Sequence, residues 1–168
     1  VNPGNSGGRL VTLDGRVAGV INSGGGDNVA FAISAALIRR VVPELLADGE
    51  YEHSYMGVQL TNVTPLIAQA NNLTETDGVY IDGTVADGPS DGVLQGSTGA
   101  ETVRGVRTPV EGDVVVSMEA EPIPTRSALS TFLALETTPG DTIAVTVVRD
   151  GRQQTVDLTL GRRPEPGA

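Results

Sequence analysis

The chain has 168 residues, a formal net charge of −10, and neither cysteine nor tryptophan. This length suits one domain or a small pair of domains, and the absence of cysteine excludes a disulfide framework. The acidic balance disfavours nucleic acid as a partner, because phosphates require a basic surface. All 11 basic residues are arginine. An acidic excess without lysine indicates a halophilic protein whose charge keeps it soluble in high salt, and an ordinary acidic protein is the alternative.

Residues 2–8 read NPGNSGG, which sets a serine among glycines. This arrangement suits acyl transfer, because the hydroxyl stands clear of the backbone while nearby N–H groups face the oxygen that becomes negative. Glycines let the chain turn tightly and bring those donors close. The structural alternative is a glycine-rich turn with an incidental serine, so the residues that follow must decide.

Two apolar runs follow, residues 9–13 and 16–21, and Asp14-Gly15 joins them. Asp-Gly between such runs predicts a hairpin with a two-residue turn. Gly4-x-Ser6-x-Gly8 also satisfies the nucleophile elbow of α/β-hydrolases, but that elbow requires a strand, a turn and then a helix. A serine that leads into a hairpin instead fits the second barrel of a chymotrypsin-like protease.

Residues 2–8 and 14–22, with 31–33, 55–58 and much of the remaining chain to Gly161, resemble the HtrA/DegP-type serine proteases. In that family a trypsin-like protease domain is followed by one or more PDZ domains. Arg9 departs from the pattern, which usually has proline there. The resemblance implies a mainly β fold with some α. Its parts would be the C-terminal portion of a chymotrypsin-like β-barrel over 1–49, a linker over 50–54, a PDZ domain (an α+β partly open barrel) over 55–161 with an insertion at about 95–111, and a disordered tail over 162–168.

The resemblance also assigns roles in the first domain. It implies that Ser6 is the nucleophile and that the N–H groups of Ser6 and Gly4 form the oxyanion hole. The strand edge implied to pair with substrate backbone comprises Val20, Ile21, Asn22 and Ser23. In the chymotrypsin order the histidine and the aspartate both precede the serine. We therefore expect them upstream of Val1 and interpret the chain as the C-terminal part of a longer protein.

His53 is the only histidine and must be weighed as a catalytic base. A Ser6–Asp27–His53 triad has the chain order of α/β-hydrolases, whose elbow the hairpin disfavours, so it is the weaker alternative. We interpret His53 as a solvent-facing linker residue. Residues 22–28 are rich in glycine but lack the lysine and the helix of a P-loop, and they predict a hairpin loop.

A strand and a helix are predicted to close the first domain. Residues 29–33 predict the last barrel strand, and Ser34 is a favourable N-cap. Apolar residues recur at four-residue spacing from Leu37 onward, which predicts a helix with one apolar face. Gly49 ends the pattern, and Pro43 inside it is expected to kink the helix or split it.

Residues 55–60 resemble the carboxylate-binding loop and first groove strand of HtrA-type PDZ domains. Backbone N–H groups of such a loop face the terminal carboxylate of a peptide, and the strand edge accepts the peptide as an added strand. Thr125 is expected to cap a helix that forms the far wall of the groove. The residues implied to contact the peptide are Tyr55, Met56, Gly57, Val58, Leu60 and Leu129; Phe132 and Leu133 share the helix face with Leu129.

The remaining pattern follows PDZ order. It predicts a short helix over 65–70, strands over 78–81 and 112–118, a small helix over 89–93 and a β-excursion within the insertion. Apolar alternation over 143–147 and 156–160, with Asp150-Gly151 between, predicts a second hairpin.

The leading expectation is a serine endopeptidase of HtrA/DegP type that acts on unfolded or misfolded proteins in quality control. The resemblance implies no cofactor and no metal. It implies unfolded polypeptides and hydrophobic C-terminal peptides as partners, a trimer-based homo-oligomer, and an extracytoplasmic or membrane-anchored location through a segment before Val1. Without its base the chain alone is expected to be inactive. The alternative is a PDZ adaptor that carries a vestigial, inactive protease segment.

Overall fold

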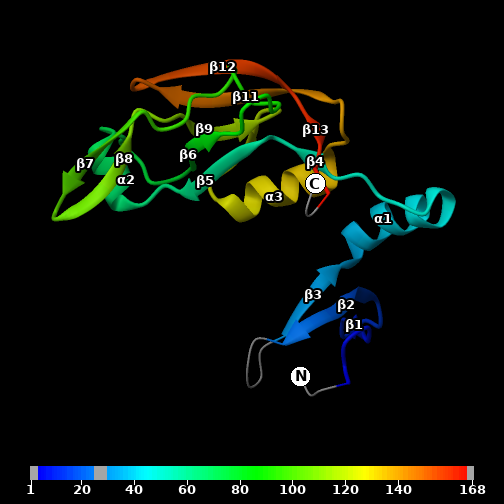
Figure 1. Cartoon of the computed structure of the whole chain (residues 1–168). Coiled ribbons are helices and arrows are strands. Elements are labelled where there is room, and N and C mark those ends of the chain that lie inside the picture. The colour runs from blue at the N-terminus through cyan, green and yellow to red at the C-terminus, as the bar shows by residue number, and fades with distance from the viewer. Residues whose placement is uncertain (1–3, 25–29, 166–168) are drawn as a thin grey trace. The chain divides into compact units, whose positions relative to one another are not determined.

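The computed structural model of the chain describes residues 4–24 and 30–165 (Figure 1). It divides into two compact units, Val1–Tyr51 and Glu52–Ala168, and this division falls inside the linker expected over 50–54. Residues 2 and 3 of the serine motif, Asp27 and the rest of the glycine-rich loop over 25–29 lie outside the described residues.

The first unit contains an antiparallel sheet in the order β1-β2-β3. Its strands are β1 (Arg9–Val11), β2 (Val17–Gly24) and β3 (Ala30–Ser34), and α1 (Ala35–Asp48) follows. Within the described part of the chain this sheet does not close on itself, so the expected barrel portion is an open sheet.

The β1–β2 turn differs from the expected two-residue hairpin. The N–H of Gly15 donates to the Thr12 carbonyl at 3.0 Å, and the N–H of Thr12 donates to the Arg16 carbonyl at 2.8 Å. Gly15 has a φ of 81°. The loop thus comprises Leu13, Asp14 and Gly15, which is the three-residue class in which a type I turn is followed by a left-handed residue. The prediction of a two-residue turn was wrong, because it counted Asp-Gly alone and left out Leu13.

The caps of α1 follow the prediction. The Ser34 side chain accepts a hydrogen bond from the Leu37 N–H, and Gly49 adopts a φ of 79° and donates its N–H to the Leu45 carbonyl. A kink or a split is expected at Pro43; the split is wrong, since the helix continues through this residue, and the kink stays a prediction. Of the residues of this unit whose burial is described, Gly19 alone is buried, and none of those in α1 is. The described part of the unit therefore has no hydrophobic core of its own.

The second unit is built on a twisted antiparallel sheet in the order β12-β11-β9-β6-β5, with β10 paired to β9. The strands of this sheet are β5 (Val58–Asn62), β6 (Val79–Thr84), β9 (Val114–Met118), β10 (Glu121–Pro122), β11 (Thr142–Arg149) and β12 (Arg152–Thr159). Two small ladders accompany it: β4 (Ser54–Tyr55) with β13 (Gly161–Arg162), and β7 (Gly99–Val103) with β8 (Val106–Val110).

The two helices of this unit cover opposite faces of the sheet, because side chains alternate along each strand. Val79 and Ile81 of β6 belong to a core that also contains Leu129 and Phe132 of α3 (Arg126–Glu136). Tyr80 points the other way and joins a second core with Ile67 of α2 (Pro65–Ala70). The β7–β8 hairpin contacts α2 on that second face (Figure 1).

Most predicted elements of this unit are present. The short helix over 65–70, the Thr125 cap of α3 and the hairpin within the insertion are confirmed. Asp150 and Gly151 form a two-residue turn, with φ of 50° and 71° as a type I′ turn requires. The helix expected over 89–93 is wrong: the chain makes successive turns there. The tail over 162–168 is expected to be disordered, but its first two residues are bonded. Arg162 pairs with Ser54, and the Arg163 N–H donates to the His53 carbonyl.

Candidate active site and peptide-binding edge

Ser6 lies in a tight turn that its glycine neighbours make possible. The N–H of Gly8 donates to the Asn5 carbonyl at 2.9 Å, which places Ser6 and Gly7 at the centre of the turn. Gly7 has a φ of 81°, as the third residue of a type II turn requires. A Cβ on Gly8 would lie 2.8 Å from the Asn5 carbonyl oxygen. The glycine pair is therefore a geometric requirement of this turn.

The turn is fixed to the central strand of its sheet. The Gly7 N–H donates to the Ile21 carbonyl at 2.8 Å, and the Ile21 N–H donates to the Gly8 carbonyl at 2.9 Å. Ser6 is exposed, and the N–H groups of Ser6 and Gly4 donate to no described residue. Among the described residues, none bonds to this hydroxyl or to these two backbone donors, and β2 holds their turn in place.

The predicted substrate edge of β2 is only partly open. Val20 pairs with Arg9 on β1 and with Ile33 on β3, and both backbone groups of Ile21 bond to the serine turn. The register of β2 against β3 shifts between Ile21 and Ser23, with Asn22 at the irregularity. Beyond Ile21, β2 has no described partner on the β1 side. Asn22 and Ser23 are the predicted residues with an open backbone edge there.

Ser6 belongs to the first unit and His53 to the second. His53 is exposed, belongs to the second unit, and accepts a hydrogen bond from the Arg163 N–H through its carbonyl. Asp27, the third member of the weaker triad, lies outside the described residues.

In the second unit, the turn at Met56 and Gly57 is held from one side. The buried Ser90 hydroxyl donates to the Met56 carbonyl at 2.7 Å, and the Val85 N–H donates to the Gly57 carbonyl at 2.8 Å. A trans peptide plane directs its N–H opposite to its C=O. The N–H groups of Gly57 and Val58 therefore point away from Ser90 and Val85. Gly57 has a φ of 71°, a conformation that glycine adopts without strain.

β5 follows this turn and is the terminal strand of its sheet, with β6 as its one partner among the described strands. Helix α3 contacts β5 and is tied to it at its first turn, where the Arg126 N–H donates to Asn62 Oδ1 at 2.7 Å. Beyond its other end, the Thr137 hydroxyl bonds to the Ser54 hydroxyl at 2.9 Å. An open strand edge with backbone donors at its start is the arrangement to which an extended peptide adds.

Burial separates the apolar residues named for this edge. Met56 and Leu129 are 2% and 3% exposed, and both belong to the core. Val58 and Leu60 of β5 are half-buried against that core, as is Leu133 of α3. Leu133 shares the apolar helix face with Leu129 but is not among the predicted peptide contacts, because its partial exposure follows only from the packing of α3.

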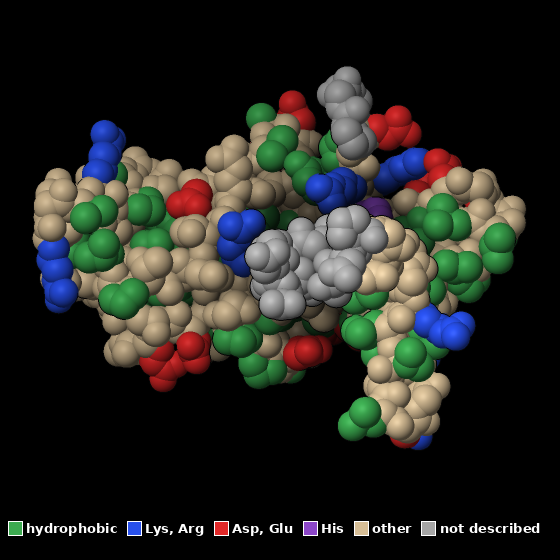
Figure 2. All heavy atoms as spheres, turned by 90° about the horizontal axis from the view of Figure 1, so that it is seen from below, with side chains coloured by type: hydrophobic (Ala, Val, Ile, Leu, Met, Phe, Trp, Pro, Cys, Tyr) green, Lys and Arg blue, Asp and Glu red, His purple; other side chains and the backbone are tan. Residues whose placement is uncertain are grey.

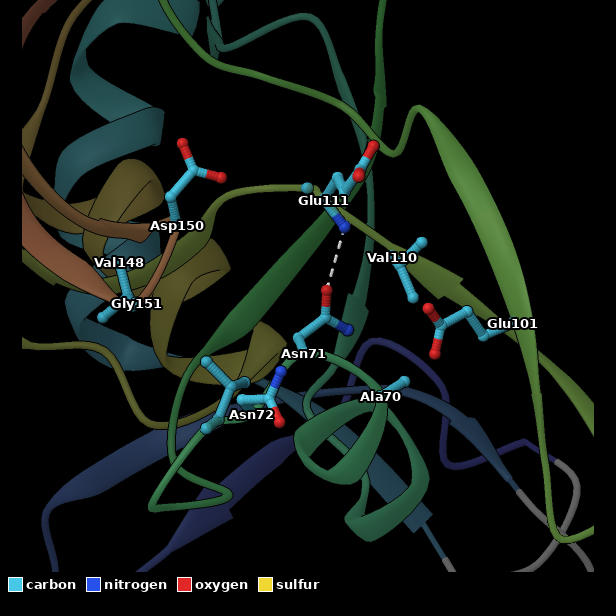
Figure 3. Close-up of a pocket in the computed structure, with 11 residues that line it drawn as sticks. Ala70, Asn71, Asn72, Glu101, Val110, Glu111, Val148, Asp150 and Gly151 are labelled. Carbon is cyan, nitrogen blue, oxygen red and sulfur yellow. Dashed lines mark hydrogen bonds between the residues drawn. The ribbon is translucent and has the colours of Figure 1, made fainter.

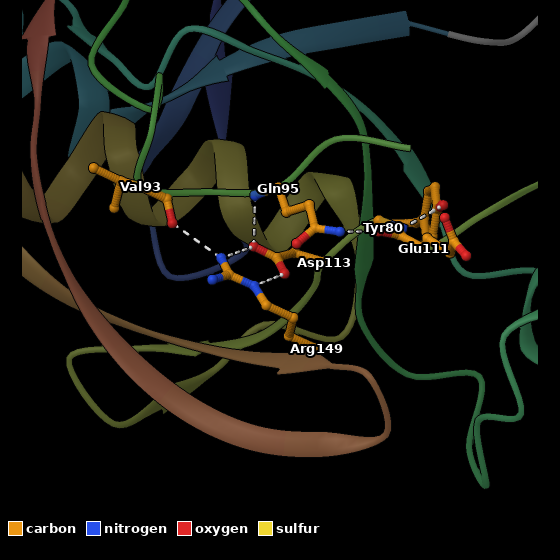
Figure 4. A network of polar contacts seen from close by, with 7 residues as sticks. Tyr80, Val93, Gln95, Glu111, Asp113 and Arg149 are labelled. Atoms are coloured by element: carbon orange, nitrogen blue, oxygen red, sulfur yellow. Dashed lines mark hydrogen bonds and ion pairs between the residues drawn. The ribbon is translucent and has the colours of Figure 1, made fainter. Parts of the chain in front are cut away.

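A buried ion pair lies behind the turns that follow β6. Asp113, fully buried, forms two bonds of 2.7 Å with the Arg149 guanidinium. The same guanidinium donates to the Val93 carbonyl at 3.0 Å, and the Gln95 N–H donates to Asp113 at 2.8 Å (Figure 4). The hydrogen bond to Asp113 raises the pKa of Arg149. Sequence reasoning missed this network, since no local pattern connects residues so far apart.

A pocket of 310 Å³ lies where α2, the β7–β8 hairpin and the β11–β12 turn meet, and Figure 3 shows its lining. Three carboxylates, those of Glu101, Glu111 and Asp150, belong to residues that line it. The Asn71 amide is used by the fold, since it accepts from the Glu111 N–H and donates to the Ile67 carbonyl. Within the ranges described, no His, Cys, Asp and Glu side chains group closely enough to hold a metal.

Asp82 on β6 is half-buried, and this burial raises its carboxyl pKa, while the charge of Arg126 lowers it in part. A raised pKa means that the native state holds this proton more tightly than the unfolded state. The contribution of Asp82 to stability is therefore lost as pH rises through its folded pKa. We expect Asp82→Asn to raise the Tm of the chain at pH 7 and to leave it unchanged at pH 3, measured by thermal melting. A Tm at pH 7 that falls below that of the parent chain would contradict this assignment.

On the face shown in Figure 2, both arginine and acidic side chains are present at the surface. No described helix is both long and apolar enough to cross a membrane.

Comparison with known proteins places these features in context. Residues 54–160 match the PDZ domain family. Over 98% of its length the chain is 34% identical to a protein of Rhizobium meliloti (strain 1021) named "Probable periplasmic serine endoprotease DegP-like", of which it covers 31%. It is 33% identical, over 99% of its length, to a protein of the same name from Ectopseudomonas mendocina (strain ymp), of which it covers 33%.

Solved structures show the same likeness. One described as "HtrA-type protease AlgW with decapeptide" matches 99% of this chain and 48% of its own, with 27% identity and a TM-score of 0.71. The chain spans about a third of the length of the curated relatives that it matches.

Proposed function

Because the chain belongs to the PDZ domain family and is homologous along its whole length to DegP- and HtrA-type serine endoproteases, we propose that it carries the nucleophile and the peptide-binding domain of a serine endopeptidase. Its substrates are unfolded or misfolded polypeptides. The observation that carries this proposal is the exposed Ser6 on a glycine turn bonded to β2, with the N–H groups of Ser6 and Gly4 bonded to no described residue.

Ser6 acts as the nucleophile. Its Oγ attacks the scissile carbonyl carbon while a histidine encoded before Val1 takes the hydroxyl proton, and an aspartate orients that histidine. The N–H groups of Ser6 and Gly4 stabilise the negative oxygen of the tetrahedral intermediate. Substrate backbone pairs with β2 beyond Ile21, at Asn22 and Ser23, because Val20 and Ile21 already bond within the protein.

The second unit binds the end of a hydrophobic peptide. The N–H groups of Gly57 and Val58 receive the terminal carboxylate, and the peptide extends along the open edge of β5. Val58, Leu60 and Leu133 supply the apolar contact, because they are the half-buried residues on the strand and the helix. Tyr55 precedes this turn on β4. Support comes from the similar AlgW structure, which contains a decapeptide.

The wider role is protein quality control. Its location is outside the cytoplasm, which relatives that are named as periplasmic support. We propose that the complete protein is a trimer-based homo-oligomer, and that this chain alone does not cleave protein because it lacks the catalytic base. A PDZ adaptor with an inactive protease segment is the second candidate. It is favoured only by the described part of the first unit, which has no hydrophobic core of its own.

Peptide binding can be tested directly on the chain. Hydrogen bonds to a charged group contribute about 1.5–3 kcal/mol, and about 1.4 kcal/mol is tenfold in affinity. We expect a fluorescein-labelled peptide with a hydrophobic, free C-terminus to bind at least about tenfold more tightly than its C-terminal amide. Fluorescence anisotropy measures both Kd values. Equal affinity for the two peptides would exclude the carboxylate-binding role of this turn.

A further inference from the structure

The backbone donors at Gly57 and Val58 take their direction from residues outside the turn. Both peptide planes are oriented through their carbonyl oxygens, which bond to Ser90 and Val85. Val85 uses a backbone N–H, which any residue except proline supplies. Ser90 instead donates through its side-chain hydroxyl, which bonds to the Met56 carbonyl of this turn. The side chain at position 90 therefore decides whether the Met56 carbonyl has this donor.

The Ser90 side chain is shielded from solvent and bonds to the turn. It is 0% exposed, and its Oγ lies 2.7 Å from the Met56 carbonyl oxygen. Met56 is itself 2% exposed, so water cannot replace the hydroxyl without entering the core. A buried carbonyl that loses its donor is left unsatisfied, which is unfavourable. Because the peptide unit is planar, any rotation that brings this carbonyl to another partner also turns the Gly57 N–H.

The segment that carries Ser90 is itself anchored. The Leu94 N–H donates to the Ser90 carbonyl at 3.0 Å. On either side of Leu94, the Val93 carbonyl accepts from Arg149 and the Gln95 N–H donates to Asp113 (Figure 4). The Asp113–Arg149 pair thus anchors the segment around Leu94, and Ser90 in this segment bonds to the Met56 carbonyl of the turn. No regular helix or strand stabilises residues 86–94, so these bonds define their position.

We propose that Ser90 is the positioning residue of the carboxylate-binding turn. It aims the Gly57 N–H at the terminal carboxylate of the peptide through the Met56 carbonyl, and it does not touch the ligand. This inference rests on the proposed peptide binding and adds to it the residue that sets its selectivity for a free C-terminus.

The test compares Ser90→Ala with the parent 168-residue chain, using the labelled peptide and its C-terminal amide. We expect the preference for the free carboxylate to fall from at least about tenfold to within about threefold, because a misdirected N–H no longer bonds the carboxylate. The matched control is Thr108→Val, which removes another buried hydroxyl that bonds a backbone carbonyl, in the β7–β8 hairpin. This control is expected to keep the full preference.

A merely structural role for Ser90 gives a different result. If Ser90→Ala weakens both peptides equally and keeps their ratio, the positioning role is wrong. If Ser90→Ala does not fold, Ser90→Cys retains the size with a weaker donor, and the ratio must fall in that variant; an unchanged ratio overturns the inference. If the parent chain shows no preference, the proposed peptide binding fails instead, so the two failures are distinguishable.

Discussion

Replacing Ser6 with alanine is expected to lower kcat by on the order of a millionfold, in a protein that joins this chain to the segment proposed to carry the catalytic histidine and aspartate. The covalent route needs the Ser6 oxygen, and the residues that remain can only bind and polarise the substrate. The turn itself persists, because its bonds involve backbone atoms of Asn5, Gly7 and Gly8. KM should therefore change little. Cleavage of an unfolded protein such as casein measures the rate.

The control for this experiment is Thr102→Ala. Thr102 is another exposed hydroxyl, on β7 of the insertion hairpin, where we assign no chemistry. The Thr102→Ala protein should cleave casein at the rate of the parent protein. A Ser6→Ala protein that retains activity within about tenfold of the parent would show that another nucleophile carries the reaction, and the adaptor interpretation of this chain would then be preferred.

The second large effect is expected at the buried ion pair. Asp113→Ala leaves the Arg149 guanidinium and the Gln95 N–H without their buried acceptor. Removing one partner of a buried pair destabilises a protein by about 3–5 kcal/mol, because the other charge stays uncompensated. Arg149 is 27% exposed at its side chain, so water compensates part of the loss, and we expect about 3 kcal/mol rather than the upper value. Urea unfolding measures the free energy.

An exposed pair in the same unit provides the comparison. Arg162 and Glu52 lie 2.7 Å apart, with side chains 49% and 43% exposed. Such pairs contribute about 0–1 kcal/mol, so Glu52→Gln should change the unfolding free energy little. A loss at Asp113→Ala no larger than that at Glu52→Gln would contradict the anchoring role assigned to Asp113. It would also weaken the argument that this network holds Ser90 in place.

Local chemistry predicted the features of this fold that depend on neighbouring residues. Ser34 and Thr125 cap helices where the sequence indicates, and Gly49 ends α1. Asp150-Gly151 turns two alternating strands as expected. In each case a side chain or a glycine satisfies a backbone requirement within a few residues, so the sequence contains the information.

The sequence predictions fail where contacts between residues distant in the sequence determine the local structure. The chain makes turns at 89–93 rather than a helix, and bonds from Met56, Asp113 and Arg149 hold the segment 90–95. Likewise, Leu129 of α3 is buried while Leu133 is partly exposed, because the packing of the helix on the sheet determines the burial of each side chain. A local pattern predicts which residues share a face, but it does not predict how deeply each one is buried.

The claim that Ser6 is an activated nucleophile can be tested by labelling with a fluorophosphonate, which reacts with the serine of an assembled catalytic site. The protein that joins this chain to the segment proposed to carry the histidine and aspartate should gain one covalent adduct, and mass spectrometry of its peptides should locate that adduct on Ser6. An unlabelled protein, or an adduct on any other residue, would contradict the claim.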